Sequence, residues 1–141
     1  MRHLLLFFAL LGLVYSTIYW KNDDPKDMAD PVIVATHQIH EIYAAYWDRK
    51  IIRLFQLMRY GTPMSRFIEE HAADEITVHV QEADYFFVDT EHGIKAIIIL
   101  EDVSQNSTDY DLVKMSMSQS ASSPTGYTVF GWEKCENLEC D

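Results

Sequence analysis

Two histidines and a glutamate near the start of the stretch HQIHEIYAAYWDRKIIRLFQ have a spacing that could hold a metal ion. His40 follows His37 by three residues, and Glu41 comes directly after it. On a helical wheel these side chains share the polar face with Asp48. They lack the His-Glu-x-x-His spacing of a working zinc site and the buried partners that orient metal-bound imidazoles. We therefore expect a solvated helix face, with no metal and no cofactor.

The two cysteines, Cys135 and Cys140, lie together in the tail KCENLECD. In an oxidising compartment such a pair can close on itself, which stabilises a fold by about 2 kcal/mol on the loop-entropy estimate. A disulfide to a second chain is the alternative. Zinc is not expected, because no nearby histidine completes a set of four ligands. The sequence also has no glycine-rich phosphate loop and no G-x-S-x-G nucleophile motif.

The first residues, MRHLLLFFALLGLVYS, have the pattern of a secretory signal peptide. A short basic start precedes 11 apolar residues, Leu4 to Val14, whereas a membrane-spanning helix needs about 20. Val14 and Ser16 stand where signal peptidase requires small side chains. We expect residues 1–16 to be removed and the protein to be extracellular. An uncleaved anchor that extends to Trp20 is the alternative.

The polar stretch SQNSTDYD contains the sequon Asn106-Ser107-Thr108. It has the composition of a turn between two strands. In an exported protein a sequon of this kind is an acceptor for an N-linked glycan. The sequence therefore predicts glycosylation at Asn106.

Charge and length restrict the class of protein. The formal net charge is −11, and removing 16 of the 141 residues leaves 125, enough for one domain. Residues 17–66 carry 7 basic and 6 acidic groups, whereas residues 67–141 carry 3 basic and 16 acidic groups. Nucleic-acid binding is not expected, because it requires a basic surface. No second long apolar run follows the first, so we expect no membrane attachment after cleavage.

The hydrophobic periodicity predicts helices first and strands afterwards. After a polar lead-in, residues 17–31, the apolar positions repeat every three to four residues and then rotate near Asp48. This indicates two helices, 32–48 and 49–59, with Tyr43, Tyr46 and Trp47 on the packed side of the first. Thr62 as N-cap and Pro63 open a third helix.

From residue 76 onward the period changes to two. Four strands are predicted, at 76–88, 94–103, 110–118 and 127–134. The alternation in the first strand changes phase near Gln81, which indicates a bulge. With the bulge, Glu82 and Asp84 face water; without it they lie on the buried face. Short connections make the strands antiparallel, and the order of elements predicts an α+β fold. The single domain is expected at 32–134, followed by an acidic tail with the cysteine pair, 135–141.

The long helix, the break at YAAYWDRKIIRLF, the short third helix and the bulged antiparallel strands resemble the nuclear transport factor 2-like superfamily. The resemblance covers residues 32–134 and implies three helices packed on a curved sheet that encloses a pocket. The sequence departs from the family between the second and third helices. LMRYG stands there in place of a strand or hairpin, so one wall of the pocket is expected to be missing.

The resemblance does not select one function, because the superfamily includes isomerases and dehydratases as well as proteins without catalysis. Isomerases of this kind use a carboxylate base and a tyrosine. The counterparts here are Glu82, Asp84 or Asp102, together with Tyr46.

We expect a secreted domain without catalysis that binds an apolar small molecule or a protein. Its pocket would be lined by Tyr43, Tyr46 and Phe55, and a homodimer is compatible with the sequence. The alternatives are a lyase or isomerase and a cystatin-like protease inhibitor. The inhibitor's Gln-x-Val-x-Gly loop is absent, since Gln81 is followed by Glu82 and Ala83.

Overall fold

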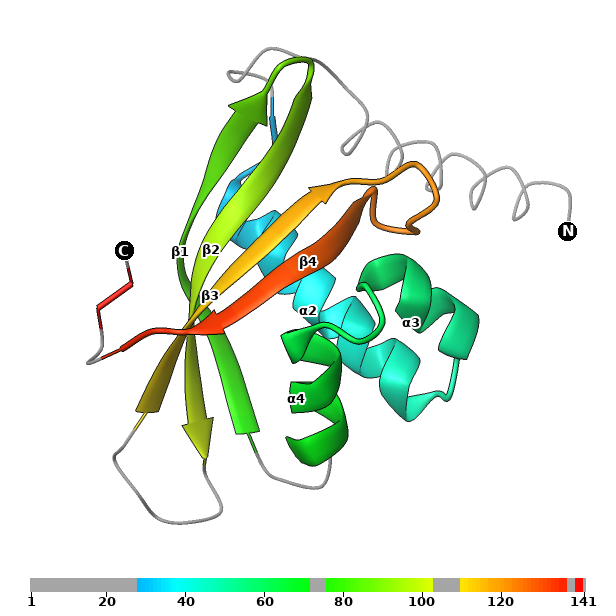
Figure 1. The fold of residues 1–141 in the computed structure, drawn as a ribbon, viewed down its shortest axis with the longest axis vertical. Coiled ribbons are helices and arrows are strands. Elements are labelled where there is room, and N and C mark those ends of the chain that lie inside the picture. The colour runs from blue at the N-terminus through cyan, green and yellow to red at the C-terminus, as the bar shows by residue number, and fades with distance from the viewer. Residues whose placement is uncertain (1–27, 72–75, 103–109, 137–138, 141) are drawn as a thin grey trace, which may run out of the picture. The chain divides into compact units, whose positions relative to one another are not determined.

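A computed structural model describes residues 28–71, 76–102, 110–136 and 139–140 (Figure 1). The predicted signal peptide, most of the lead-in and Asn106 lie outside the described residues. All helices and strands described here belong to one compact unit, Pro31–Asp141. The element order is three helices followed by four strands, as the sequence predicted.

The helices are α2 (Pro31–Trp47), α3 (Ile51–Leu57) and α4 (Pro63–His71). The predicted break is confirmed: α2 ends at Trp47, and Arg49 adopts a positive φ of 55° that no helix continues through. The second helix is shorter than predicted. α4 begins where the sequence placed it, because the carbonyl of Thr62 accepts the backbone N–H of Arg66 at 3.3 Å.

The four strands form one antiparallel sheet in the order β1 (Ile76–Val88), β2 (Glu91–Asp102), β3 (Tyr110–Gln119) and β4 (Tyr127–Lys134). The predicted bulge is confirmed, because the register between β1 and β2 shifts between Val80 and Glu82. A second irregularity, between β3 and β4, was not predicted. Ser116 pairs with Gly131 and Met117 with Val129, which leaves Phe130 as the extra residue.

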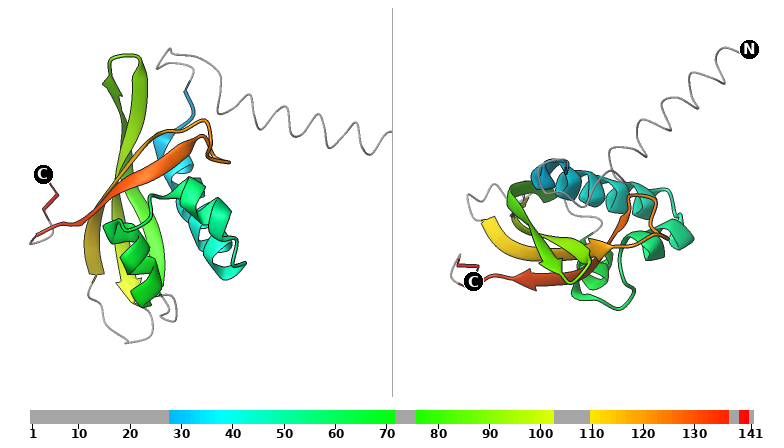
Figure 2. Two further views of the ribbon diagram at one scale, coloured as in Figure 1. Left: turned by 45° about the vertical axis from the view of Figure 1, so that its right-hand side comes forward. Right: turned by 90° about the horizontal axis from the view of Figure 1, so that it is seen from above.

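The core lies between one face of the sheet and the helices. Ile94 and Ile98 of β2 are opposite Met117 and Val113 of β3, and all four are buried. Figures 1 and 2 show α2 lying across this face. The buried side chains that it contributes are Val34, Ala35, Gln38, Ile39, Ile42 and Ala45.

α4 covers the end of the sheet beside β4. The ring of Phe67 lies 5.2 Å from the ring of Trp132, between centroids. Two side chains of α4, Met64 and Ile68, are fully buried. The early helices therefore form one layer and the sheet the other.

The segment between α3 and α4 forms no strand of its own. Met58 makes a single parallel bridge with Val129, and the backbone N–H of Arg59 donates to the Val129 carbonyl at 3.0 Å. The sequence indicated that a wall would be missing at LMRYG. In place of that wall, the segment makes the single bridge between Met58 and Val129 at the edge of β4.

Candidate binding surface

The three residues predicted to line a pocket lie on α2 and α3 but face different surroundings. Tyr43 is half-buried, and burial raises the pKa of its hydroxyl above the ordinary value of 10.0. Tyr46 is half-buried beside Trp47, with ring centroids 5.9 Å apart. Phe55 is exposed and lies against Tyr60 at 5.1 Å. A hollow of about 280 Å³ lies elsewhere, between Pro63 and β3–β4.

Two of the carboxylates considered for catalysis, Glu82 and Asp84, lie on the face of the sheet that α2 does not cover. Glu82 pairs with Ile97 and Asp84 with Lys95, and both carboxylates are exposed. Ile97 alternates with buried Ile98, so this pair points away from the face that α2 covers. Tyr46 belongs to α2. The structure therefore does not bring Tyr46 together with Glu82 or Asp84. The third carboxylate considered, Asp102, belongs to the last residue of β2.

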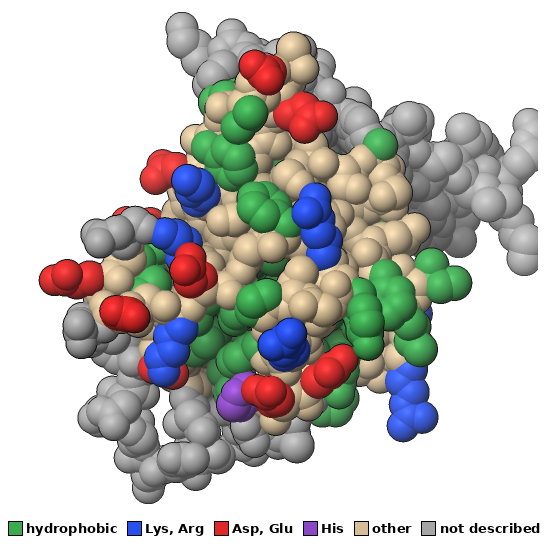
Figure 3. Space-filling view, in the orientation of Figure 1, with side chains coloured by type: hydrophobic (Ala, Val, Ile, Leu, Met, Phe, Trp, Pro, Cys, Tyr) green, Lys and Arg blue, Asp and Glu red, His purple; other side chains and the backbone are tan. Residues whose placement is uncertain are grey.

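Exposed apolar side chains gather where α2 ends and α3 begins. We call this set the corner surface. Figure 3 shows hydrophobic side chains over α3 on the side of the molecule that faces the viewer. The members of the corner surface, with the exposed fraction of each, are Trp47 63%, Ile51 61%, Ile52 78%, Phe55 47% and Tyr60 73%.

The geometry of α3 explains why these side chains are uncovered. Of its seven residues only Leu57 is buried. Ile51, Ile52 and Phe55 lie one and four residues apart and share one face of the helix, which no other described element covers. Sequence analysis placed Trp47 in the packed face, and that prediction was wrong. The apolar stripe looked like core because periodicity reports a shared face and not what covers it.

Positive charge surrounds the corner surface. Residues 49–66 contain five basic residues and no acidic residue. The ammonium of Lys50 lies 3.2 Å from the carboxylate of Asp48, and Arg53 pairs with Glu41 of α2. These pairs leave the corner surface with an excess of cations, namely Arg49, Lys50, Arg53 and Arg59 against Glu41 and Asp48.

A second cluster lies on the helix-facing side of the sheet, near the β1–β2 turn. The Nε2 atom of His92 lies 2.7 Å from the hydroxyl oxygen of Tyr127. The backbone N–H of His92 donates to the side-chain Oε1 atom of Gln119 at 3.1 Å. The rings of Tyr85 and Phe87 flank His92 at 5.5 and 6.0 Å. His92 falls between two of the strands predicted from the sequence, 76–88 and 94–103. Its role as the link between the β1–β2 hairpin and β4 depends on contacts that periodicity does not report.

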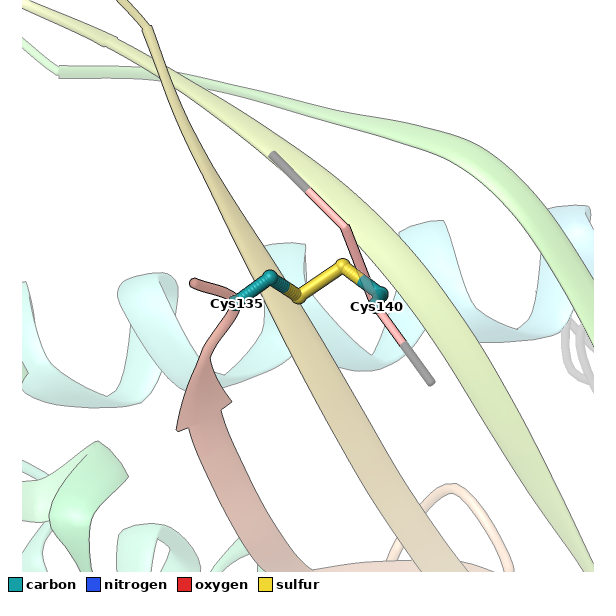
Figure 4. The surroundings of a disulfide bond; sticks show 2 residues. All are labelled: Cys135 and Cys140. Carbon is teal, nitrogen blue, oxygen red and sulfur yellow. A yellow bond between two sulfur atoms is a disulfide. The ribbon is translucent and has the colours of Figure 1, made fainter. Parts of the chain in front are cut away.

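The cysteine pair closes on itself, as predicted. The sulfur atoms of Cys135 and Cys140 lie at disulfide distance, with their Cα atoms 4.9 Å apart (Figure 4). A bridge between Glu136 and Glu139 and a hydrogen bond from the Cys135 N–H to the Leu112 carbonyl, 2.8 Å long, accompany it. The bond therefore ties a short tail loop next to β3.

Within the described residues, no three His, Cys, Asp or Glu side chains are grouped so that they could hold a metal ion. No described helix has the length and apolar character to span a bilayer. Comparisons with protein-family models, with curated proteins and with solved structures found no match to this chain.

Proposed function

We propose that this chain is a secreted, non-catalytic domain that binds a protein through the corner surface. The observation that supports it is the exposure of five large apolar side chains on one corner. A soluble domain rarely exposes such a contiguous group unless another molecule covers it. Tryptophan, tyrosine, phenylalanine and arginine are also the residues enriched in protein interfaces.

A protein partner fits this surface better than an apolar small molecule does. Sites for small molecules are concave and bury most of the ligand. Tyr43 and Tyr46 are half-buried on α2, whereas Phe55 is exposed on α3. Ile52 projects into solvent with 78% of its surface exposed. A projecting side chain can pack against apolar side chains of another macromolecule.

Export and family membership belong to the same proposal. The disulfide-distance pair Cys135–Cys140 favours an oxidising compartment, as the signal-like first residues do. Helices on one face of a bulged antiparallel sheet are also what the nuclear transport factor 2-like resemblance implies. The single bridge at Met58 in place of a hairpin agrees with a member that has no closed pocket.

A site-specific photo-crosslinker tests the proposal. The crosslinker is placed at Ile52 in the chain secreted by expressing cells, and its matched control is placed at Ile33, which is 65% exposed on α2. We expect discrete protein adducts from position 52 and none of the same mass from position 33. Adducts that do not depend on position would contradict the proposal.

Fluorescent fatty-acid and steroid probes supply the second arm. We expect no saturable binding to the purified protein. Saturable binding that a Tyr46→Ala variant abolishes would instead support the small-molecule form of the prediction.

A further inference from the structure

The turn between β1 and β2 combines exposed apolar side chains with negative charge, whereas the corner surface combines them with an excess of positive charge. We call residues 87–91 the hairpin tip. Phe87 and Val88 are exposed apolar side chains, and Asp89 and Glu91 are exposed carboxylates. In Figure 3 acidic side chains and a hydrophobic area lie together at the end of the molecule where Figure 1 places this hairpin.

The hairpin tip is held in place before it meets any partner. The ring of Phe87 lies 6.0 Å from that of His92, and His92 is joined to Tyr127 at 2.7 Å. Val88 pairs with Glu91 across a two-residue turn, in which Asp89 has a φ of 54°. A rigid tip loses little conformational entropy on binding.

Within one copy the tip and the corner surface do not meet. Figures 1 and 2 show the β1–β2 hairpin extending past the helical layer, with α3 at a separate side of the unit. One surface is apolar with excess positive charge and the other is apolar with negative charge. Each is therefore complementary to the other surface on a different molecule.

We propose that the corner surface binds the hairpin tip of a second copy of this chain. This inference rests on the proposed function and names the partner. Phe87 and Val88 would pack against Ile51, Ile52 and Phe55. Asp89 and Glu91 would lie beside the cations that border the corner, Arg49 and Lys50 among them.

The contact is heterologous, because two different patches meet. Such contacts close into rings, of which a reciprocal two-fold dimer is the smallest, or continue as open chains. The tip is small, and residues 17–141 of each copy carry 10 basic and 22 acidic groups, a net charge of −12 that opposes association. We therefore expect a weak, concentration-dependent assembly.

Complementation between two variants tests the geometry. The corner variant carries Ile51→Asp and Ile52→Asp, and it should fold because acidic residues stabilise the first turn of a helix. The tip variant carries Phe87→Ser and Val88→Ser. Ile33→Asp is the matched control, since Ile33 is exposed outside both surfaces. Sedimentation over a concentration series gives the weight-average mass, and circular dichroism checks each fold.

We expect the mass of the wild type and of the control to rise with concentration above that of the monomer. Each variant alone should associate at least about tenfold more weakly than the wild type, which corresponds to about 1.4 kcal/mol in the free energy of association. An equimolar mixture should form a one-to-one complex and nothing larger, because it contains only one intact pair of surfaces.

Three outcomes would overturn the inference. They are a wild type that stays monomeric, a tip variant that associates like the wild type, and a mixture that forms no complex. A monomeric wild type whose position 52 still crosslinks to a different protein would refute self-association and leave the proposed function standing. No specific adduct at position 52 at all would refute the proposed function itself.

Discussion

Two consecutive helices of this protein distribute polar and apolar side chains in opposite ways. α2 buries a glutamine completely, with Gln38 at 0% exposure, while α3 exposes Ile52 at 78%. Only three residues separate the two helices. The contrast cannot come from composition, because both helices are rich in isoleucine. It comes from what lies against each one.

The buried amide of Gln38 is fully engaged. Its Nε2 donates to the carbonyls of Leu57 at 2.8 Å and Tyr127 at 3.0 Å, and its Oε1 accepts the hydroxyl of Thr125. One side chain thereby joins α2 to the end of α3 and to the start of β4. A buried polar group with all its partners costs little, and it fixes how these elements meet.

α3 has the reverse arrangement. Leu57 is buried under α2 and β4, whereas the opposite side of the helix meets solvent. Exposed apolar surface gains nothing from the hydrophobic effect within one molecule. The residues of the corner surface therefore do not contribute to folding in proportion to their size, which is the reason for assigning them a role in binding.

The same substitution on the two helices should have very different effects. Ile42→Ala on α2 removes a fully buried side chain and should lower the free energy of unfolding by about 2–5 kcal/mol. Ile52→Ala on α3 should change it by less than about 0.5 kcal/mol. Urea denaturation of both variants measures the difference. A loss of more than about 1.5 kcal/mol for Ile52→Ala would show that the corner surface is part of the core.

Glutamines on the two helices provide a second matched pair. Gln38→Leu removes three buried hydrogen bonds, so at about 1 kcal/mol each we expect a loss of about 3 kcal/mol. The Tyr127 carbonyl keeps the hydrogen bond from the hydroxyl of Thr125 at 3.2 Å. Gln56→Leu on α3 changes a half-buried side chain and should cost less than about 0.5 kcal/mol. Equal effects in urea denaturation would contradict the bracing role assigned to Gln38.

Elements with strong periodicity could be predicted from the sequence. The break before Ile51, the helix start at Pro63 and the bulge near Gln81 each follow from a local rule about apolar spacing or turn chemistry. These rules need only neighbours along the chain. For the same reason the α+β class could be predicted from the order of helices and strands.

Contacts between distant segments could not be predicted. Gln38 is polar, and nothing local reveals that Thr125, 87 residues away, will satisfy it. Trp47 follows the apolar periodicity of α2, yet the helix ends at this residue and no helix or strand that the structure describes covers its side chain, which is 63% exposed. Exposure depends on tertiary packing, so the corner surface could be found only in the folded structure.

The link between the two helices should matter less than their cores. Arg53 of α3 pairs with Glu41 of α2, with 42% and 25% of their side-chain surfaces exposed. Arg53→Ala should cost about 0.5–1 kcal/mol, because partly exposed ion pairs are screened by water and salt. Lys50→Ala is the control, since Lys50 and Asp48 are more exposed at 59% each. A loss at 0.5 M salt as large as at low salt would argue against an electrostatic origin.

The smallest expected effect is that of Tyr43→Phe, which should leave the free energy of unfolding unchanged at neutral pH. Burial raises the pKa of its hydroxyl in the folded state above 10.0, so the folded protein retains this proton after the unfolded chain has lost it. The resulting stability is complete below pH 10 and decreases as the pH rises toward the folded-state pKa. Tyr43→Phe should remove that part of the alkaline decrease, and urea midpoints of wild type and variant from about pH 8 to 11 measure it. The two proteins differ only in the Tyr43 hydroxyl, so the difference between the two curves isolates Tyr43. Parallel curves would mean that the hydroxyl of Tyr43 is hydrated in the folded protein as it is in the unfolded chain. The contrast in burial between α2 and α3 would then be confined to the first part of α2.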